Sequence, residues 1–174
     1  GLRAPDARWL DEALRQLATT GPASETCLAT ADGELHVYRG QLHVLRHRPP
    51  APAGAVPWSG EDELPWGDGR VSFQPTVGGG ICRRLLRNAP VELRCRQGGE
   101  RLQPDPRRPL RTLRNLLQEA AIPPWERRRL PLLWCGERLV WVAGIGVDAA
   151  FVCAPGAPGV MPALCLADGQ SGAH

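Results

Sequence analysis

Residues 96–125 read RQGGERLQPDPRRPLRTLRNLLQEAAIPPW, and the patterns on either side are best interpreted from this segment. A Gly-Gly turn is followed by an arginine-rich stretch and then by leucines at helical spacing, which a Pro-Pro-Trp sequence ends. The spacing predicts an amphipathic helix over 109–121, with Leu110, Leu113 and Leu117 on its buried side. Four arginines are expected at the start of that helix: Arg107, Arg108, Arg111 and Arg114.

Strand-like patterns surround this helix. Residues 91–97 alternate apolar and charged side chains, as a strand with one solvated face does. Further strands are expected at 70–74, 130–135 and 138–142, and a short helix is expected at 81–89. These patterns predict an α+β fold in which residues 58–153 form a C-terminal domain of antiparallel strands packed on one central helix.

The remainder of the chain divides into three segments. Residues 6–18 have a helical apolar face, and short strands at 26–30, 34–38 and 41–45 suit a small antiparallel meander, so residues 1–47 are predicted as a first unit. Residues 48–57 are rich in proline and alanine and are predicted as a linker. Residues 154–174 are small and rich in proline and glycine, which predicts a disordered tail.

Positive charge is concentrated in one part of the chain. Residues 83–138 contain 14 arginines and 6 acidic residues, a formal charge of +8, whereas the whole chain carries +3. There is no lysine, and the planar guanidinium group matches phosphate geometry. An array of such groups can engage several phosphates of a nucleic-acid backbone. The sequence therefore predicts an RNA-binding set: Arg96, Gly98, Gly99, Arg101, Arg107, Arg108, Arg111, Arg114, Arg127, Arg128 and Arg129.

Several of these features allow a second interpretation. Gly98 and Gly99 form either a simple hairpin turn or a place where the backbone approaches a sugar-phosphate closely. Trp125 and Trp134 either stack on a base or pack into the core. The basic face binds either nucleic acid or, in a non-catalytic protein-interaction module, an acidic protein or the chain's own acidic half, for example through Glu61–Glu63 and Asp68.

Other classes of site find little support in the sequence. The six cysteines have no C-x-x-C spacing, so free thiols are expected and no metal site is predicted. No histidine or aspartate partners are visible for Ser59, Ser72 and Thr112, so a nucleophilic triad has no support and no catalytic residue is predicted. No segment has the roughly 18 apolar residues of a membrane helix, and the N-terminus lacks a signal-peptide pattern, so no membrane partner is expected and the cytoplasm is the expected compartment.

An ordered series of uncommon elements resembles a known family. The elements are Arg96-x-Gly98-Gly99-Glu100-Arg101-x-x-Pro104, Leu113-x-x-Leu116-Leu117-Gln118, Pro123-Pro124-Trp125 and Val142-x-Gly144-x-Gly146-Val147. Over roughly residues 70–150 the chain closely resembles the C-terminal domain of bacterial tRNA(Ile)-lysidine synthetase. Residues 1–47 are similar, less specifically, to the end of that family's middle, substrate-recognition domain.

The resemblance implies a role in tRNA modification. In this family an N-terminal PP-loop ATPase domain uses ATP and Mg to adenylate the wobble cytidine of the isoleucine tRNA with a CAU anticodon, and lysine then displaces AMP to give lysidine. The Ser-Gly-Gly-x-Asp-Ser motif of that domain is absent here. The resemblance therefore implies a non-catalytic, tRNA-positioning part of an ATP-dependent carbon–nitrogen ligase, with no cofactor of its own. Its oligomeric state is left open, a dimer of the full-length enzyme being one alternative.

Overall fold

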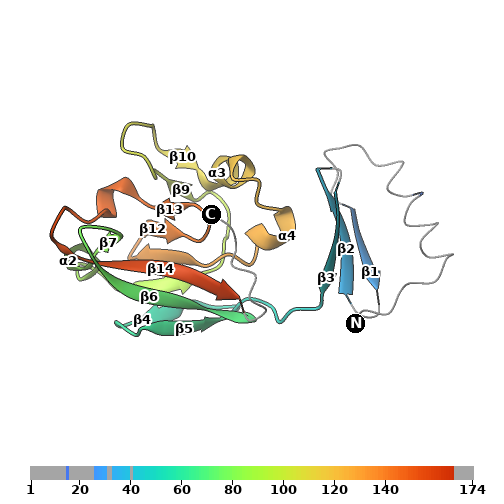
Figure 1. Ribbon diagram of the computed structural model, residues 1–174, viewed down its shortest axis with the longest axis horizontal. Helices are drawn as coiled ribbons and strands as arrows, with labels where there is room; N and C mark the ends of the chain where they lie inside the picture. The colour runs from blue at the N-terminus through green and yellow to red at the C-terminus, as the bar shows by residue number, and fades with distance from the viewer. Residues whose placement is uncertain (1–14, 16–25, 31–32, 40, 167–174) are drawn as a thin grey trace. The chain divides into compact units, whose positions relative to one another are not determined.

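The chain divides into two compact units between Arg48 and Pro49 (Figure 1). The computed structural model describes residues 15, 26–30, 33–39 and 41–166. Unit 1 comprises Gly1–Arg48 and unit 2 comprises Pro49–His174. The helix predicted at 6–18 falls, apart from Arg15, outside the described residues.

Unit 1 contains a three-stranded antiparallel sheet in the order β1-β2-β3. Its strands are β1 (Thr26–Thr30), β2 (Gly33–Tyr38) and β3 (Gln41–Arg46). Arg39 has a positive φ of 51° between β2 and β3, as a tight hairpin turn requires. The predicted meander is therefore confirmed, because the three strands pair in sequence order as an antiparallel sheet.

Unit 2 is built mainly from two antiparallel sheets. The five-stranded sheet has the order β13 (Gly146–Val147), β12 (Arg138–Val142), β11 (Leu132–Cys135), β8 (Val91–Arg94) and β4 (Val56–Trp58). The four-stranded sheet has the order β5 (Glu63–Trp66), β6 (Gly69–Val77), β14 (Pro158–Leu166) and β7 (Ile81–Cys82). The remaining elements are the ribbon of β9 (Arg101–Leu102) with β10 (Arg111–Thr112), the helices α2 (Arg83–Leu86), α3 (Leu113–Glu119) and α4 (Pro124–Arg127), and the 3₁₀ turn η1 (Ala149–Phe151).

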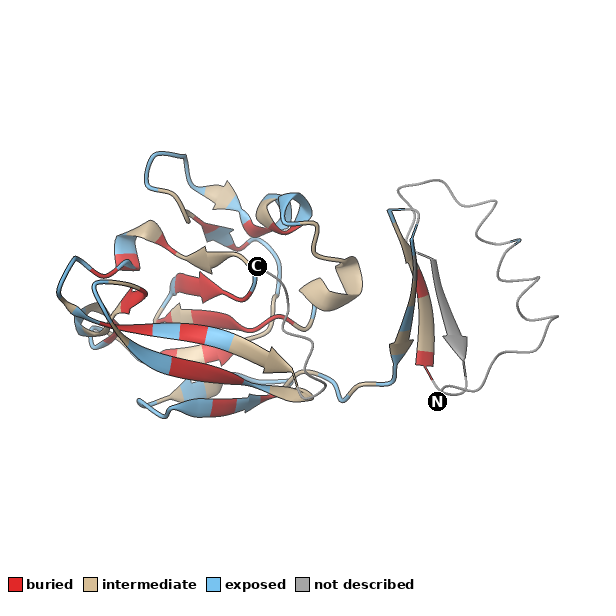
Figure 2. Ribbon diagram, in the orientation of Figure 1, coloured by how far each residue is buried: buried red, intermediate tan, exposed pale blue. Residues whose placement is uncertain are grey.

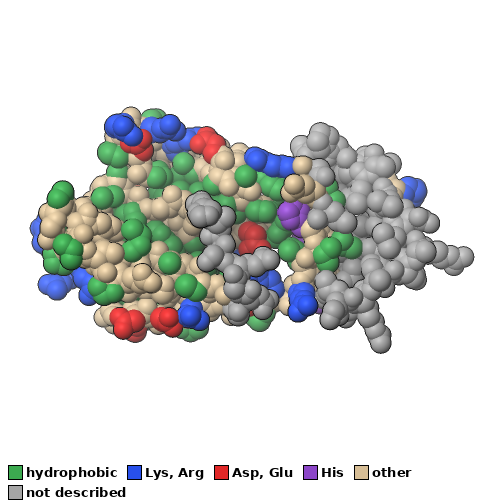
Figure 3. Space-filling view, viewed as in Figure 1, with side chains coloured by type: hydrophobic (Ala, Val, Ile, Leu, Met, Phe, Trp, Pro, Cys, Tyr) green, Lys and Arg blue, Asp and Glu red, His purple; other side chains and the backbone are tan. Residues whose placement is uncertain are grey.

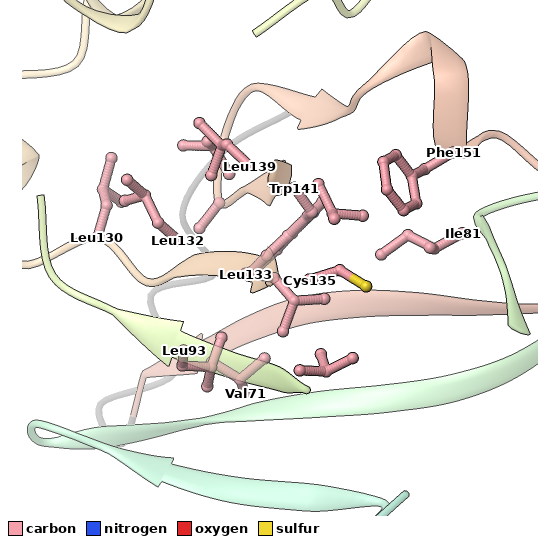
Figure 4. Close-up of a cluster of buried hydrophobic side chains, with 14 of the residues drawn as sticks. Val71, Ile81, Leu93, Leu130, Leu132, Leu133, Cys135, Leu139, Trp141 and Phe151 are labelled. Atoms are coloured by element: carbon pink, nitrogen blue, oxygen red, sulfur yellow. The ribbon is translucent and has the colours of Figure 1, made fainter. Parts of the chain in front are cut away.

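Residues from both sheets form one apolar core (Figure 4). Val71 of β6, Leu93 of β8 and Leu133 of β11 are fully buried. Trp58 of β4 stacks on Phe73 of β6 with ring centroids 4.8 Å apart, which joins the two sheets directly. Each such side chain stabilises the fold by about 1.5–3 kcal/mol through burial alone. The exposed residues of unit 2 lie mainly in connecting loops and on outer strand faces (Figure 2).

The fold class predicted from the sequence, α+β with antiparallel strands, is confirmed. The arrangement differs in one respect, because the two sheets rather than a helix occupy the centre. Helix α3 packs on this core through Leu113 and Leu117, both of which are fully buried. The helix is therefore a peripheral element whose remaining surface is available for other contacts.

The helix predicted over 109–121 is too long. Residues 111–112 pair with β9 as strand β10, and the Leu113 N–H donates to the Glu100 carbonyl at 2.8 Å, so α3 begins only at Leu113. Leu110 was predicted on the buried side but is 46% exposed, because it precedes both elements. Arg107 and Arg108 consequently lie in the loop at 103–110, not at the start of the helix. Pairing with β9 overrides the helical spacing of the leucines.

Two shorter elements also differ from their predicted extents. The strand predicted at 91–97 ends at Arg94, and the helix predicted at 81–89 is replaced by the short strand β7 followed by the four-residue helix α2. The strands predicted at 70–74 and 130–135 are present as β6 and β11 with ends that differ by one to three residues, and the strand predicted at 138–142 is β12 with the predicted bounds. Local apolar patterns predicted that these elements exist. They did not predict the residues at which the elements end, because tertiary pairing determines those ends.

The prediction of a disordered tail at 154–174 is wrong for its described part. Residues 158–166 form β14, which pairs with β6 along its whole length and with β7 at Gly159 and Val160. Val160 is fully buried. The predicted linker at 48–57 also packs on unit 2, because Pro52 and Pro49 accept hydrogen bonds from Cys95 and Arg129, and residues 56–57 belong to β4.

Candidate nucleic-acid interface

Five of the predicted arginines lie close together on unit 2. They are carried by β9, the loop at 103–110, β10 and α3, which are neighbours in the fold (Figure 1). Basic and acidic side chains alternate along this edge of the molecule (Figure 3). We call this set the arginine surface: Arg101, Arg107, Arg108, Arg111 and Arg114.

The loop at 103–110 is held in place by its own side chains. Asp105 accepts hydrogen bonds from the backbone N–H of Arg107 at 2.9 Å and from its guanidinium at 3.1 and 3.2 Å. Gln103 donates to the carbonyl of Arg108 at 2.7 Å. Such Asx turns fix a loop without burying it. The side chains of Arg107 and Arg108 are 88% and 70% exposed and extend from this ordered loop into solvent.

Asp105 and Glu119 both lie among these guanidinium groups. The Arg107 guanidinium, hydrogen-bonded to Asp105, lowers the pKa of that carboxyl, and the Arg108 charge adds to the effect. Hydrogen bonding by Arg111 likewise lowers the pKa of Glu119, which also feels the charge of Arg108. Five guanidinium groups and two ionised carboxylates leave this surface with a formal charge of +3.

The arginines differ in how strongly they are engaged within the chain. Arg111 pairs with both carboxylate oxygens of Glu119, and its side chain is 24% exposed. Arg101 donates only a long hydrogen bond, 3.4 Å, to the Leu110 carbonyl. Arg114 is exposed on α3 and has no ion pair within the described part of the chain. Arg101 and Arg114 are therefore the least engaged members, and Arg107 and Arg108, although they pair with Asp105, stay far more exposed than Arg111.

The predicted residues at 96–100 form a turn around a buried carboxylate. Glu100 is 7% exposed, and its Oε1 accepts from the N–H groups of Gln97 and Gly98 at 2.5 and 2.6 Å. Arg96 faces the other oxygen at 3.4 Å. Gly98 and Gly99 have φ of 102° and 84°, which side chains rarely tolerate, and both are exposed. The glycines thus have a structural reason to be there, and their contact with a sugar-phosphate stays a prediction.

The three arginines at 127–129 are not equivalent. Arg129 donates to the Pro49 carbonyl at 2.6 Å and to Asp68 at 3.1 Å, and its own carbonyl accepts from the Trp66 indole. Arg127 donates to the Ile122 carbonyl at 2.7 Å. These contacts tie both side chains into the fold. Arg128 alone of the three is exposed.

The two tryptophans considered as base platforms are both half-buried. The Arg94 guanidinium lies 5.1 Å from the centroid of the Trp134 ring, so that face is already covered. The Trp134 Nε1 is buried and has no hydrogen-bond partner in the described residues. These contacts favour the packing interpretation for Trp134.

The described residues show no sign of a metal site or a membrane span. Their histidine, cysteine and acidic side chains form no group of three that could hold a metal ion. Cys82, Cys95, Cys135, Cys153 and Cys165 are free thiols. The helices that the structure describes have seven residues or fewer, well short of a membrane span.

The fold and this surface define a two-unit α+β protein with an exposed cluster of guanidinium groups on unit 2. Residues 91–164 match the family model of the TilS substrate C-terminal domain, and residues 1–43 match that of the TilS substrate binding domain. Together these matches cover more than half of the chain, so the chain belongs to the tRNA(Ile)-lysidine synthase (TilS) family.

Curated relatives are similar along most of the chain. The tRNA(Ile)-lysidine synthase of Nitrosomonas europaea is 39% identical over 165 residues, which cover 93% of this chain and 36% of that protein. The tRNA(Ile)-lysidine synthases of Aromatoleum aromaticum and Azoarcus sp. are 42% and 40% identical over 92% and 100% of this chain. The chain spans 36–38% of the length of these three relatives.

Proposed function

We propose that this chain is the tRNA-binding region of a tRNA(Ile)-lysidine synthase and positions the tRNA for the enzyme. One observation supports this above all: the arginine surface belongs to the segment that matches the substrate C-terminal domain. The match to a substrate binding domain in residues 1–43 adds independent support from unit 1.

The arginine surface suits the backbone of a folded RNA. Exposed guanidinium groups at 107, 108 and 114 bind phosphates and release counterions, which supplies affinity without reading sequence. A-form RNA presents its phosphates and 2′-hydroxyls in a fixed shape, so recognition by this surface depends on shape more than on bases. Asp105 holds the loop in one conformation, so little ordering remains for the moment of binding.

We further propose that the bound RNA is the isoleucine tRNA with a CAU anticodon. In the whole enzyme, a domain outside these residues would use ATP, with magnesium, to activate the wobble cytidine, and lysine would complete the modification. Unit 2 contributes by holding the tRNA body, so its arginines affect binding of the tRNA rather than the chemical step.

A filter-binding competition separates this function from that of a protein-interaction module. The 174-residue chain is titrated with isoleucine tRNA in the presence of an acidic peptide, added so that its total negative charge equals that of the tRNA. We expect the tRNA to stay bound, because a peptide lacks the fixed phosphate spacing of a duplex. Displacement of the tRNA by the peptide at equal charge would favour the protein-interaction module.

A further inference from the structure

A second group of arginines lies on α2, outside both segments that match the family models. Arg83 and Arg84 belong to this helix and Arg87 is its C-cap, whereas the matches cover residues 1–43 and 91–164. In Figure 1, α2 and α4 lie at opposite ends of unit 2, and the arginine surface lies between them. We call the group the α2 patch: Arg83, Arg84 and Arg87.

Among the described residues, no carboxylate lies within 4.0 Å of the α2 patch, whereas most arginines of unit 2 have such a partner. In the described part of that unit, eight arginines lie within 4.0 Å of a carboxylate: Arg70, Arg94, Arg96, Arg107, Arg108, Arg111, Arg129 and Arg138. The three members of the α2 patch are not among them, and Arg84 and Arg87 are exposed. Arg83 makes one long hydrogen bond, 3.4 Å, to the Gly159 carbonyl.

The fold keeps these three charges close together. Leu86 of α2 is 5% exposed and anchors the helix on the core. Arg87 is four residues from Arg83 and three from Arg84, the spacings at which like charges on a helix repel. The macrodipole of a four-residue helix is too small to offset the repulsion among three arginine side chains. Helix stability therefore does not account for the α2 patch, and a bound polyanion would relieve the repulsion.

We propose that the α2 patch is a second phosphate-binding surface for the RNA that unit 2 holds. This inference rests on the proposed function and extends it to residues that the family matches do not cover. Unpaired guanidinium groups bind phosphate without first breaking an internal ion pair, which Arg111 must do. Because α2 lies at one end of unit 2 and β10 and α3 lie away from that end, the ligand is an extended RNA backbone that runs from the α2 patch to the arginine surface.

The salt dependence of tRNA binding tests the α2 patch. The double variant Arg84→Ala/Arg87→Ala of the 174-residue chain is compared with the unmodified chain in filter-binding titrations at several NaCl concentrations. Two lost phosphate contacts lower the slope of log Kobs against log [NaCl] by about 1.8 in magnitude. A hydroxyl-radical footprint on the tRNA loses one protected segment and retains the segment protected by the arginine surface.

Two control variants make the result specific. Arg70→Ala removes an exposed guanidinium that is already paired with Glu63 at 2.9 Å, and it leaves the slope and the footprint unchanged. Arg84→Lys/Arg87→Lys keeps the charges and retains most of the slope, and thermal unfolding verifies that every variant is folded. A folded Arg84→Ala/Arg87→Ala variant with unchanged slope and footprint overturns the α2 patch but leaves the proposed function intact. Absence of tRNA binding by the unmodified chain contradicts the proposed function itself.

Discussion

Two carboxylates, those of Asp105 and Glu119, orient side chains of the arginine surface. Asp105 fixes both the backbone and the guanidinium of Arg107, and Glu119 holds Arg111 against α3. Because the Arg107 and Arg108 side chains stay largely exposed, pairing with Asp105 orients them without removing them from solvent. The exposed pairs contribute little to stability, so their main effect is on the geometry of the surface.

The pKa of Asp105 provides a test of this arrangement. The Arg107 hydrogen bonds lower that pKa from its ordinary value of 3.8, so the carboxylate stays charged to a lower pH than an isolated aspartate. The stabilisation it provides is present above the ordinary value and is lost as the pH falls through the lowered pKa. NMR titration of the side-chain carboxyl carbon is expected to give a midpoint below 3.8 that rises towards it in Arg107→Ala. An identical midpoint in both proteins would show that the pair does not form in solution.

The sequence shows the arginine-rich region, but it does not show which of its arginines are exposed and which are held in internal contacts. Arg129 and Arg108 look alike in the sequence, yet Arg129 is tied to Pro49 and Asp68, far away in the chain, and Arg108 extends into solvent. Arg111 and Glu119 are eight residues apart, so the three- and four-residue spacings of helical neighbours do not predict their ion pair. Such differences arise from tertiary contacts, so only the fold separates anchoring arginines from displayed ones.

At the level of elements, β14 shows why the end of the sequence was misinterpreted. Proline inside a strand usually argues against a central position. Pro162 pairs with Phe73, whose N–H donates instead to Asp62 at 2.8 Å, so this is a non-hydrogen-bonded pair of the β6–β14 ladder. The backbone nitrogen of Pro162 therefore faces the β7 side of β14. On that side β7 pairs with β14 only at Gly159 and Val160, so no described strand lies opposite Pro162 to accept a hydrogen bond. The proline costs no ladder bond there.

Two adjacent substitutions test the role of β14. Val160 is fully buried between the sheets, whereas Met161 is 40% exposed. We expect Val160→Ala to lower the free energy of unfolding of unit 2 by roughly 1–3 kcal/mol, and Met161→Ala to lower it by less than about 1 kcal/mol. Urea denaturation followed by tryptophan fluorescence measures both, because Trp58 and Trp66 lie in or beside the core. Equal, small effects would mean that β14 does not belong to the core.

Local patterns predicted elements better than they predicted boundaries. The alternation over 91–94 and 138–142 identified β8 and β12, because one face of each strand is buried. The start of α3 and the length of β8 depend on hydrogen bonds to β9 and β11, which no local pattern encodes.

On the scale of the whole molecule, each of the two compact units carries a match to the same family. The concentration of positive charge at 83–138 was visible in the sequence, and the structure divides it into the arginine surface, the α2 patch and a set of anchoring residues. The sequence alone locates this concentration of charge, because charge is a property of composition. The division could not be predicted because it depends on which acidic residues the fold brings near.

The salt dependence of tRNA binding by the arginine surface tests the central claim most directly. The slope of log Kobs against log [NaCl] is measured for the 174-residue chain and for the triple variant Arg107→Ala/Arg108→Ala/Arg114→Ala, with thermal unfolding as the check on folding. If each side chain contacts one phosphate, the variant binds more weakly and its slope is smaller in magnitude by about 2.7. A folded triple variant that binds tRNA with the affinity and slope of the unmodified chain would contradict the account.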